Sequence, residues 1–185
     1  MSGPPLLVLG PGWQTASRAL TAASLPAWGR ELTARHPDRR LAEARQLVRA
    51  AAGQQGLSGV LYMATDEGQE DAPSLEEALA QVLYPGLGAT QGCLSVEPPL
   101  PVLHVVRADI VQGYACLPLR AAAETALVGA LLCVWREAQA QGRLLAVAVL
   151  SPPLAEALPE LVQSLLQGPG PRRLRFLVSD IARLP

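Results

Sequence analysis

The sequence predicts one doubly wound α/β domain with a mostly parallel sheet, and three observations lead to this fold class. Short apolar runs typical of buried strands alternate with amphipathic stretches typical of helices. The apolar runs do not alternate with polar residues, so both faces of the sheet must be covered. The connections are mostly short, and parallel strands need helices as crossovers. Because no linker or repeat divides residues 1–185, we expect a single domain.

The first half of the chain supplies three strand–helix pairs. The expected strands cover residues 6–9, 27–33 and 57–64. The expected helices cover residues 13 to about 23, 38–53 and 74–85. Ser74 and Glu77 have the Ser-x-x-Glu spacing of a capping box at the start of the third helix. Pro85 lacks a backbone N–H, so we expect it to break or kink that helix.

The second half continues the same alternation. The expected strands cover residues 102–106, 144–150 and 174–178. The expected helices cover residues 119–138 and 159–167. The helix 119–138 has the longest apolar face, and Gly142 is expected to end it.

Composition excludes several classes of function. The net charge is −1, so we expect no electrostatic binding of nucleic acid or of an anionic membrane. No apolar run approaches the roughly 20 residues of a membrane span, and no basic segment typical of a signal peptide follows Met1. The cysteines, Cys93, Cys116 and Cys133, have no CxxC spacing and are typical of reduced, mostly buried thiols. We therefore expect a cytoplasmic protein.

The turn after the first strand is the place to look for a dinucleotide site. Such a site needs G-x-G-x-x-G, because small residues let the backbone approach the pyrophosphate at a helix N-terminus. Here Gly10 and Gly12 match, but Thr15 replaces the third glycine, Pro11 removes an N–H, and Trp13 adds bulk. Glu31 lies about 20 residues on, where an acidic ribose ligand belongs. The sequence favours a plain or degenerate turn over a working nucleotide site.

All 15 basic residues are arginine, and the chain contains no lysine. Reductases of the short-chain type use a Tyr-x-x-x-Lys pair in which the lysine lowers the pKa of the tyrosine. Tyr62, Tyr84 and Tyr114 are present, but none of them can have such a partner. We therefore expect no catalytic residues for this reaction.

The two histidines do not indicate a nucleophilic site. His36 precedes a proline in an expected loop, and His104 lies in an expected buried strand, where it is most simply a core residue. A Ser–His–acid set could be composed from Ser151, His104 and Asp180. No nucleophile elbow supports it, so a chance combination is the better interpretation.

Two charged clusters remain. The first is an acidic loop, formed by Asp66, Glu67, Glu70 and Asp71. It lacks the periodicity of a calcium loop, so we interpret it as a solvated loop and expect no metal site. The second is basic, formed by Arg172, Arg173 and Arg175 before the last expected strand. It is interpreted as a solvated strand start, with contact to an acidic partner as the alternative.

From residue 45 to 184 the chain resembles the structural subdomain of the ketoreductase region of modular polyketide synthases, a truncated, non-catalytic, Rossmann-like relative of short-chain reductases. The stretches that carry the likeness are 57–64, 74–87, 101–107, 126–137 and 174–184. The best match is the spacing of Gly129 and Glu137, followed by the apolar run 144–150. The sequence departs from the family where its Thr-Arg-Gly turn is Arg107-Ala108-Asp109 and its His-Pro is Ala138-Gln139.

The resemblance implies a non-catalytic scaffold without a cofactor, whose partner is a ketoreductase catalytic subdomain or another polyketide synthase domain. The alternative is a degenerate NAD(P)-binding short-chain oxidoreductase that uses Gly10, Gly12 and Glu31. A third interpretation is an unrelated α/β interaction module. The helix face around Leu127 and the strand near Leu174 are both candidate interfaces, and the oligomeric state is open.

Overall fold

The computed structural model describes residues 3–66, 71–107, 118–140, 145–150, 154–167 and 176–178. The strands in this part of the chain are β1 (Leu6–Leu9), β2 (Ala27–Gly29), β3 (Gly59–Met63), β4 (Val102–Arg107), β5 (Leu145–Leu150) and β6 (Phe176–Val178). The helices are α1 (Trp13–Ala22), α2 (Pro37–Gln55), α3 (Leu75–Leu94), α4 (Leu119–Ala140) and α5 (Leu154–Gln167). Strands and helices alternate throughout, as the sequence predicts.

The strands form one six-stranded sheet in the order β2-β1-β3-β4-β5-β6. Every neighbouring pair is parallel, which confirms the doubly wound α/β prediction. Five of these strands, β2-β1-β3-β4-β5, correspond to the 3-2-1-4-5-6 sheet of dinucleotide-binding domains without its strand 3, and β6 adds one strand at the other edge. The order reverses between β1 and β3, so the crevice at their carboxyl ends is the expected ligand site.

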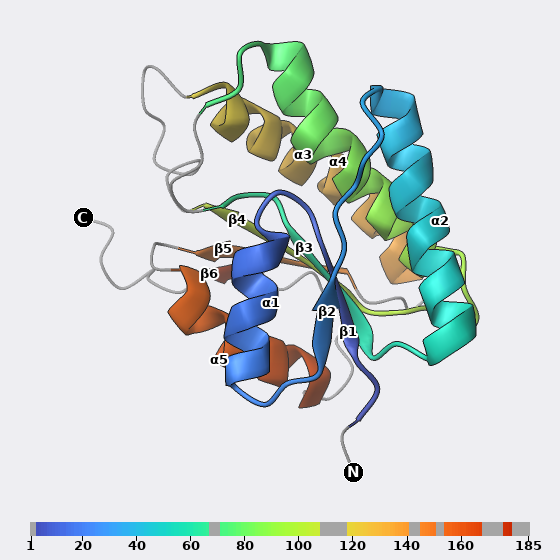
Figure 1. Cartoon of the computed structure of the whole chain (residues 1–185). Coiled ribbons are helices and arrows are strands. Elements are labelled where there is room, and N and C mark those ends of the chain that lie inside the picture. Colours follow the sequence, from blue (N-terminus) through green and yellow to red (C-terminus); the bar gives the residue numbers. More distant parts are fainter. Residues whose placement is uncertain are drawn as a thin grey trace.

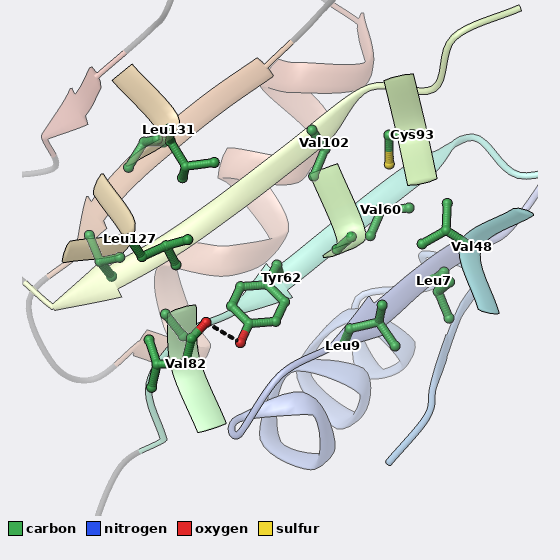
Figure 2. Close-up of a cluster of buried hydrophobic side chains, with 14 of the residues drawn as sticks. Leu7, Leu9, Val48, Val60, Tyr62, Val82, Cys93, Val102, Leu127 and Leu131 are labelled. Carbon is green, nitrogen blue, oxygen red and sulfur yellow. Dashed lines mark hydrogen bonds between the residues drawn. The ribbon is translucent and has the colours of Figure 1, made fainter. Parts of the chain in front are cut away.

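Helices cover both faces of the sheet (Figure 1). Helices α2, α3 and α4 lie on one face, and α1 and α5 lie together on the other. The strand residues divide between two cores with the two-residue period of a pleated sheet. Leu7, Leu9 and Tyr62 face the α2–α4 side, as Figure 2 shows. Leu6 and Val8 face the α1 and α5 side. The strands are therefore buried on both faces.

Helix α3 does not end at Pro85, so the break that the sequence predicted as one of two outcomes does not occur. It runs on to Leu94 with the proline inside it. A proline at this position removes the N–H that would bond the carbonyl of Gln81, four residues earlier. The buried hydroxyl of Tyr62 lies 3.2 Å from the Gln81 carbonyl oxygen and 2.8 Å from that of Val82. Figure 2 draws the shorter of these bonds, to Val82, and the longer one reaches the carbonyl that Pro85 leaves without an N–H donor.

Glycines let α3 pack closely against its neighbours. A Cβ at Gly88 would lie 2.2 Å from the carbonyl oxygen of Leu41 in α2, and one at Gly92 would lie 2.8 Å from the Cβ of Val48. On the other side, a Cβ at Gly86 would lie 2.8 Å from the Leu127 side chain of α4. At each of these three positions, a neighbouring atom of this chain leaves no room for a side chain, which accounts for the glycine.

Strand β2 is shorter than the sequence predicts, ending at Gly29 rather than at residue 33. Beyond it, the N–H groups of Thr33 and Ala34 donate to the carboxylate of Glu43 in α2, at 3.0 and 2.9 Å. These N–H groups therefore bond to a helix side chain and not to the sheet.

Because Tyr62 donates to the carbonyl that Pro85 leaves without an N–H partner, we expect substitutions of these two residues to have coupled effects on stability. Removing the buried hydroxyl with Tyr62→Phe should lower the free energy of unfolding by about 1–2 kcal/mol. In a Pro85→Ala background the new N–H can bond the Gln81 carbonyl, so the same change should cost at least about 0.5 kcal/mol less. Urea denaturation of the four proteins measures this coupling. Equal costs in both backgrounds would contradict the compensation.

Candidate functional site

A cavity of about 210 Å³ lies at the reversal of strand order, beside the turn that follows β1. Its lining residues are Gly10, Pro11, Trp13, Glu31, Leu32, Arg40 and Gln81. They come from five places: the β1–α1 turn, the first residue of α1, the segment after β2, the first turn of α2, and α3. The structure thus brings Gly10 and Glu31 together, as the nucleotide hypothesis requires. Gly12, the third residue of that hypothesis, is buried and is not part of this lining.

The two glycines of the turn are used by the chain's own backbone. Gly10 has a φ of 95°, which favours glycine. A Cβ on Gly10 would lie 2.3 Å from the carbonyl oxygen of Met63, and one on Gly12 would lie 2.1 Å from that of Thr65. The N–H of Gly12 donates to the Met63 carbonyl at 3.4 Å. In a nucleotide site the second glycine lets the backbone approach the pyrophosphate, whereas here the Thr65 carbonyl lies against Gly12.

A carboxylate lies at the first turn of α1. Thr15, at the position of the third glycine, donates from Oγ1 to Oδ1 of Asp66 at 2.9 Å. A helix N-terminus attracts an anion, and in dinucleotide sites that anion is the pyrophosphate. Here Asp66 places its own negative charge beside this turn, where it would repel a phosphate. The residues of this turn therefore do not fit a dinucleotide.

The described tyrosines have no lysine partner. Tyr62 is fully buried, and burial raises the pKa of its hydroxyl well above the usual range. The residue four positions on is Asp66 after Tyr62 and Gly88 after Tyr84. Tyr114 lies outside the described residues, and the fourth residue after it is Pro118. The Tyr-x-x-x-Lys pair is therefore absent from the whole sequence.

His104 is a core residue on β4. Its side chain is fully buried, its Nε2 lies 2.8 Å from Oγ1 of Thr90, and its ring centroid lies 5.3 Å from that of Tyr62. The Thr90 hydroxyl also lies 3.1 Å from the carbonyl oxygen of Gly86, and the tautomer of His104 sets which of the two groups donates in the Thr90–His104 pair. Ser151 and Asp180, the other members of the composed catalytic set, lie outside the described residues. His36 is exposed at the N-terminus of α2.

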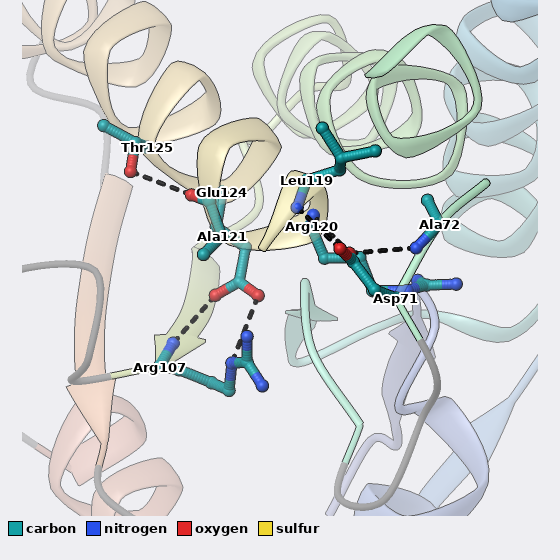
Figure 3. A network of polar contacts seen from close by, with 8 residues as sticks. All are labelled: Asp71, Ala72, Arg107, Leu119, Arg120, Ala121, Glu124 and Thr125. Atoms are coloured by element: carbon teal, nitrogen blue, oxygen red, sulfur yellow. Dashed lines mark hydrogen bonds and ion pairs between the residues drawn. The ribbon is translucent and has the colours of Figure 1, made fainter. Parts of the chain in front are cut away.

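The acidic loop has structural roles at its two ends. Asp66 bonds Thr15, and Asp71 accepts from the N–H groups of Leu119 and Arg120 at 2.9 and 3.0 Å, which caps α4 (Figure 3). The backbone hydrogen bonds from Arg120 and Leu119 lower the pKa of Asp71. Among the described residues, no three His, Cys, Asp or Glu side chains gather as metal ligands. Glu67 and Glu70 lie outside the described residues, as does the arginine cluster 172–175.

The sequence did not single out Glu124, a buried carboxylate in the second turn of α4. One carboxylate oxygen accepts from the backbone N–H of Arg107 at 2.9 Å, and the other lies 3.6 Å from Nε of the same arginine. Figure 3 shows that this pair joins α4 to the carboxyl end of β4. The sequence did offer one signal, because Glu124 is an acidic residue within an otherwise apolar helical face. Its partner, Arg107, lies on β4 and could not be identified from the helix alone.

The burial of His104 leads us to expect that the stability of the fold depends on pH. Burial lowers the pKa of His104 to about 3, so the folded state keeps it neutral while the unfolded state binds a proton below about pH 6.5. Stability should therefore fall as the pH drops below about 6.5, with up to about 1.4 kcal/mol per pH unit from this group. Urea denaturation between pH 5 and 7.5 measures the slope.

The variant His104→Gln should lose this part of the slope, whereas His36→Gln, at an exposed position, should keep it. An unchanged slope in His104→Gln would show that another group is responsible.

The described helices include none long and apolar enough to cross a membrane. Cys93 is a buried free thiol and Cys133 is an exposed one. Cys116 lies outside the described residues.

Comparison with known proteins gives the fold. No model of a protein family matches the chain, and no curated protein matches its sequence. A short-chain dehydrogenase from Rhodopseudomonas palustris is similar in structure, with a TM-score of 0.66 and 13% identity over 94% of this chain and 95% of that one. A GDP-L-fucose synthetase from Naegleria fowleri bound to NADP has a TM-score of 0.52 and 11% identity, over 80% of this chain and 50% of that one.

At sequence identities this low, structural similarity establishes the fold but not the function. Nothing in these likenesses links the chain to polyketide synthases. What they establish is that the chain has a Rossmann-like fold similar to that of short-chain dehydrogenases.

Proposed function

We propose that this chain is a non-catalytic structural domain of a polyketide synthase, located in the cytoplasm, which packs against a ketoreductase catalytic half or a neighbouring synthase domain. Its mechanism is packing: it covers apolar surface on the partner and fixes the partner's orientation. The polyketide setting rests on the sequence resemblance between residues 45 and 184, and the short-chain dehydrogenase-like fold is compatible with it.

The observation that carries the non-catalytic role is the contact between the end of β3 and the first turn of α1. The Met63 and Thr65 carbonyls take the space beside Gly10 and Gly12, and the Asp66 carboxylate bonds Thr15. In a nucleotide-binding reductase, the second glycine of this turn lets the backbone approach the pyrophosphate of the cofactor.

The absence of lysine supports the same role independently, because no tyrosine in the chain can have its pKa lowered by a lysine ammonium. A Rossmann-like domain that lacks both the cofactor-binding turn and the Tyr–Lys pair can still act by packing its surface against another domain.

One observation favours a second candidate, a degenerate NAD(P)-binding oxidoreductase. Gly10 and Glu31 line the same cavity, together with the indole of Trp13 and with Arg40. Part of a nucleotide could contact the residues that line this cavity even if the turn does not bind the pyrophosphate. This candidate requires micromolar affinity for NADPH or NADH, and the structural role requires none.

Co-expression with the ketoreductase catalytic half of a polyketide synthase from the same organism tests the structural role. We expect the two chains to co-purify, with a buried interface of at least about 1,000 Å² in the complex. A stand-alone short-chain reductase from that organism is the matched control and should not co-purify. Failure of the two halves to associate, or a genome without any polyketide synthase, would contradict the proposal.

A further inference from the structure

The cavity at the reversal of strand order has opposite charges in its lining. Glu31 lines it from the segment after β2, and Arg40 lines it from the first turn of α2. Among the described residues, these two form no ion pair with each other or with a third residue. Glu43, in the same helix as Arg40, instead accepts from the N–H groups of Thr33 and Ala34. A carboxylate and a guanidinium are therefore both available to a bound molecule.

Contacts within the chain hold the polar groups of this lining in place. Arg40 donates from Nε to the carbonyl oxygen of Ala34, and no described residue accepts from its two terminal nitrogens. Gln81 donates from Nε2 to the Glu77 carboxylate at 2.6 Å, so its amide oxygen remains an acceptor. Because these side chains are already ordered, binding costs less conformational entropy than it would at free surface side chains.

Trp13 forms an aromatic wall of the same cavity. Its ring lies against β2, because a Cβ on Gly29 would be 2.1 Å from the ring atom Cε3. Pro11 and Leu32 add apolar lining beside it. The cavity has a volume of about 210 Å³, which is below the about 300–1,000 Å³ of sites for drug-sized ligands. The occupant that fits is therefore a molecule much smaller than a dinucleotide.

The balance of charge favours a molecule that is neutral overall. Glu31 and Arg40 together contribute no net charge to the lining. A phosphate ester would be attracted by Arg40 but repelled by Glu31, and also by Asp66 at the neighbouring turn. A zwitterion meets no such repulsion. Its carboxylate matches the planar donors of the Arg40 guanidinium, and its ammonium matches the Glu31 carboxylate.

We propose that this cavity binds a small amino acid as its zwitterion. The carboxylate of the ligand bonds Arg40, and its ammonium bonds Glu31 and the amide oxygen of Gln81. Hydrocarbon atoms of the ligand lie against Trp13 and Leu32, where they leave water. The proposal does not depend on the synthase role, because a chain that binds no ketoreductase half can still bind an amino acid here.

Titration of the ¹⁵N-labelled protein with the standard amino acids, β-alanine and γ-aminobutyrate tests the proposal. The readout is the indole N–H signal of Trp13, and that of Trp28, which does not line the cavity, is the internal control. At least one of these ligands should shift the Trp13 signal saturably, with a Kd below about 1 mM. Its analogues without the carboxylate or without the ammonium should bind about 10-fold more weakly or worse, because each loses a charged hydrogen bond.

Two variants assign the charges. Arg40→Gln and Glu31→Gln should each weaken binding of the amino acid about 10-fold or more, and Glu31→Gln should leave binding of the analogue without the ammonium unchanged. Arg39→Gln and Asp38→Asn, at exposed positions outside the lining, are the matched controls and should bind like the parent chain. Circular dichroism checks that each variant is folded, and Glu31, being exposed, can be replaced without disturbing the core.

Three results would overturn the proposal. One is a Trp13 signal that no amino acid moves at about 10 mM, and another is binding that both Arg40→Gln and Glu31→Gln leave unchanged. The third is tighter binding of adenosine 2′,5′-bisphosphate than of any amino acid, which would make the cavity a nucleotide site. If the chain binds an amino acid here but no ketoreductase half, only the proposed synthase role is lost.

Discussion

The approach of the carboxyl end of β3 to the first turn of α1 is the constraint on which the rest of the site depends. The carbonyls of Met63 and Thr65 reach the turn so closely that only glycine fits at positions 10 and 12, and Asp66 then reaches Thr15. These contacts hold β1, α1 and β3 together at the reversal of strand order. They also use the space and the helix terminus that a dinucleotide would need. Gly10 and Gly12, which resemble part of a dinucleotide-binding motif, therefore allow close packing between the β1–α1 turn and the end of β3.

A second set of contacts organises the helical layer on the other face. Pro85 deprives α3 of a hydrogen bond, and Tyr62 supplies a donor to the freed carbonyl from the neighbouring strand. This accounts for a fully buried tyrosine without assigning it chemistry. Close packing at Gly88 fixes α3 against α2, while Asp71 and Glu124 hold the start of α4. Together they fix the position of α4 beside α3.

Local patterns were sufficient for most of the fold and for part of the site. Apolar periodicity located the strands and helices, and the short connections implied a parallel sheet. The errors occurred where a distant side chain decides the outcome: Glu43 takes the N–H groups that would have lengthened β2, and Tyr62 allows α3 to pass through Pro85. In the site, spacing alone brought Gly10 and Glu31 together. The pairing of Thr15 with Asp66 joins residues 51 positions apart, so only the folded chain reveals it.

In the folded chain, the Met63 and Thr65 carbonyls and the Asp66 carboxylate occupy the turn after β1. The most direct measurement is a titration of the ¹⁵N-labelled protein with NADPH, followed by NMR at the amides of Gly10, Gly12 and Thr15. We expect these amide signals to stay in place at millimolar NADPH, because Asp66 and the carbonyls of Met63 and Thr65 already occupy the turn. Saturable shifts of the Gly12 and Thr15 amides at micromolar NADPH would contradict it and would identify the turn as a working nucleotide site.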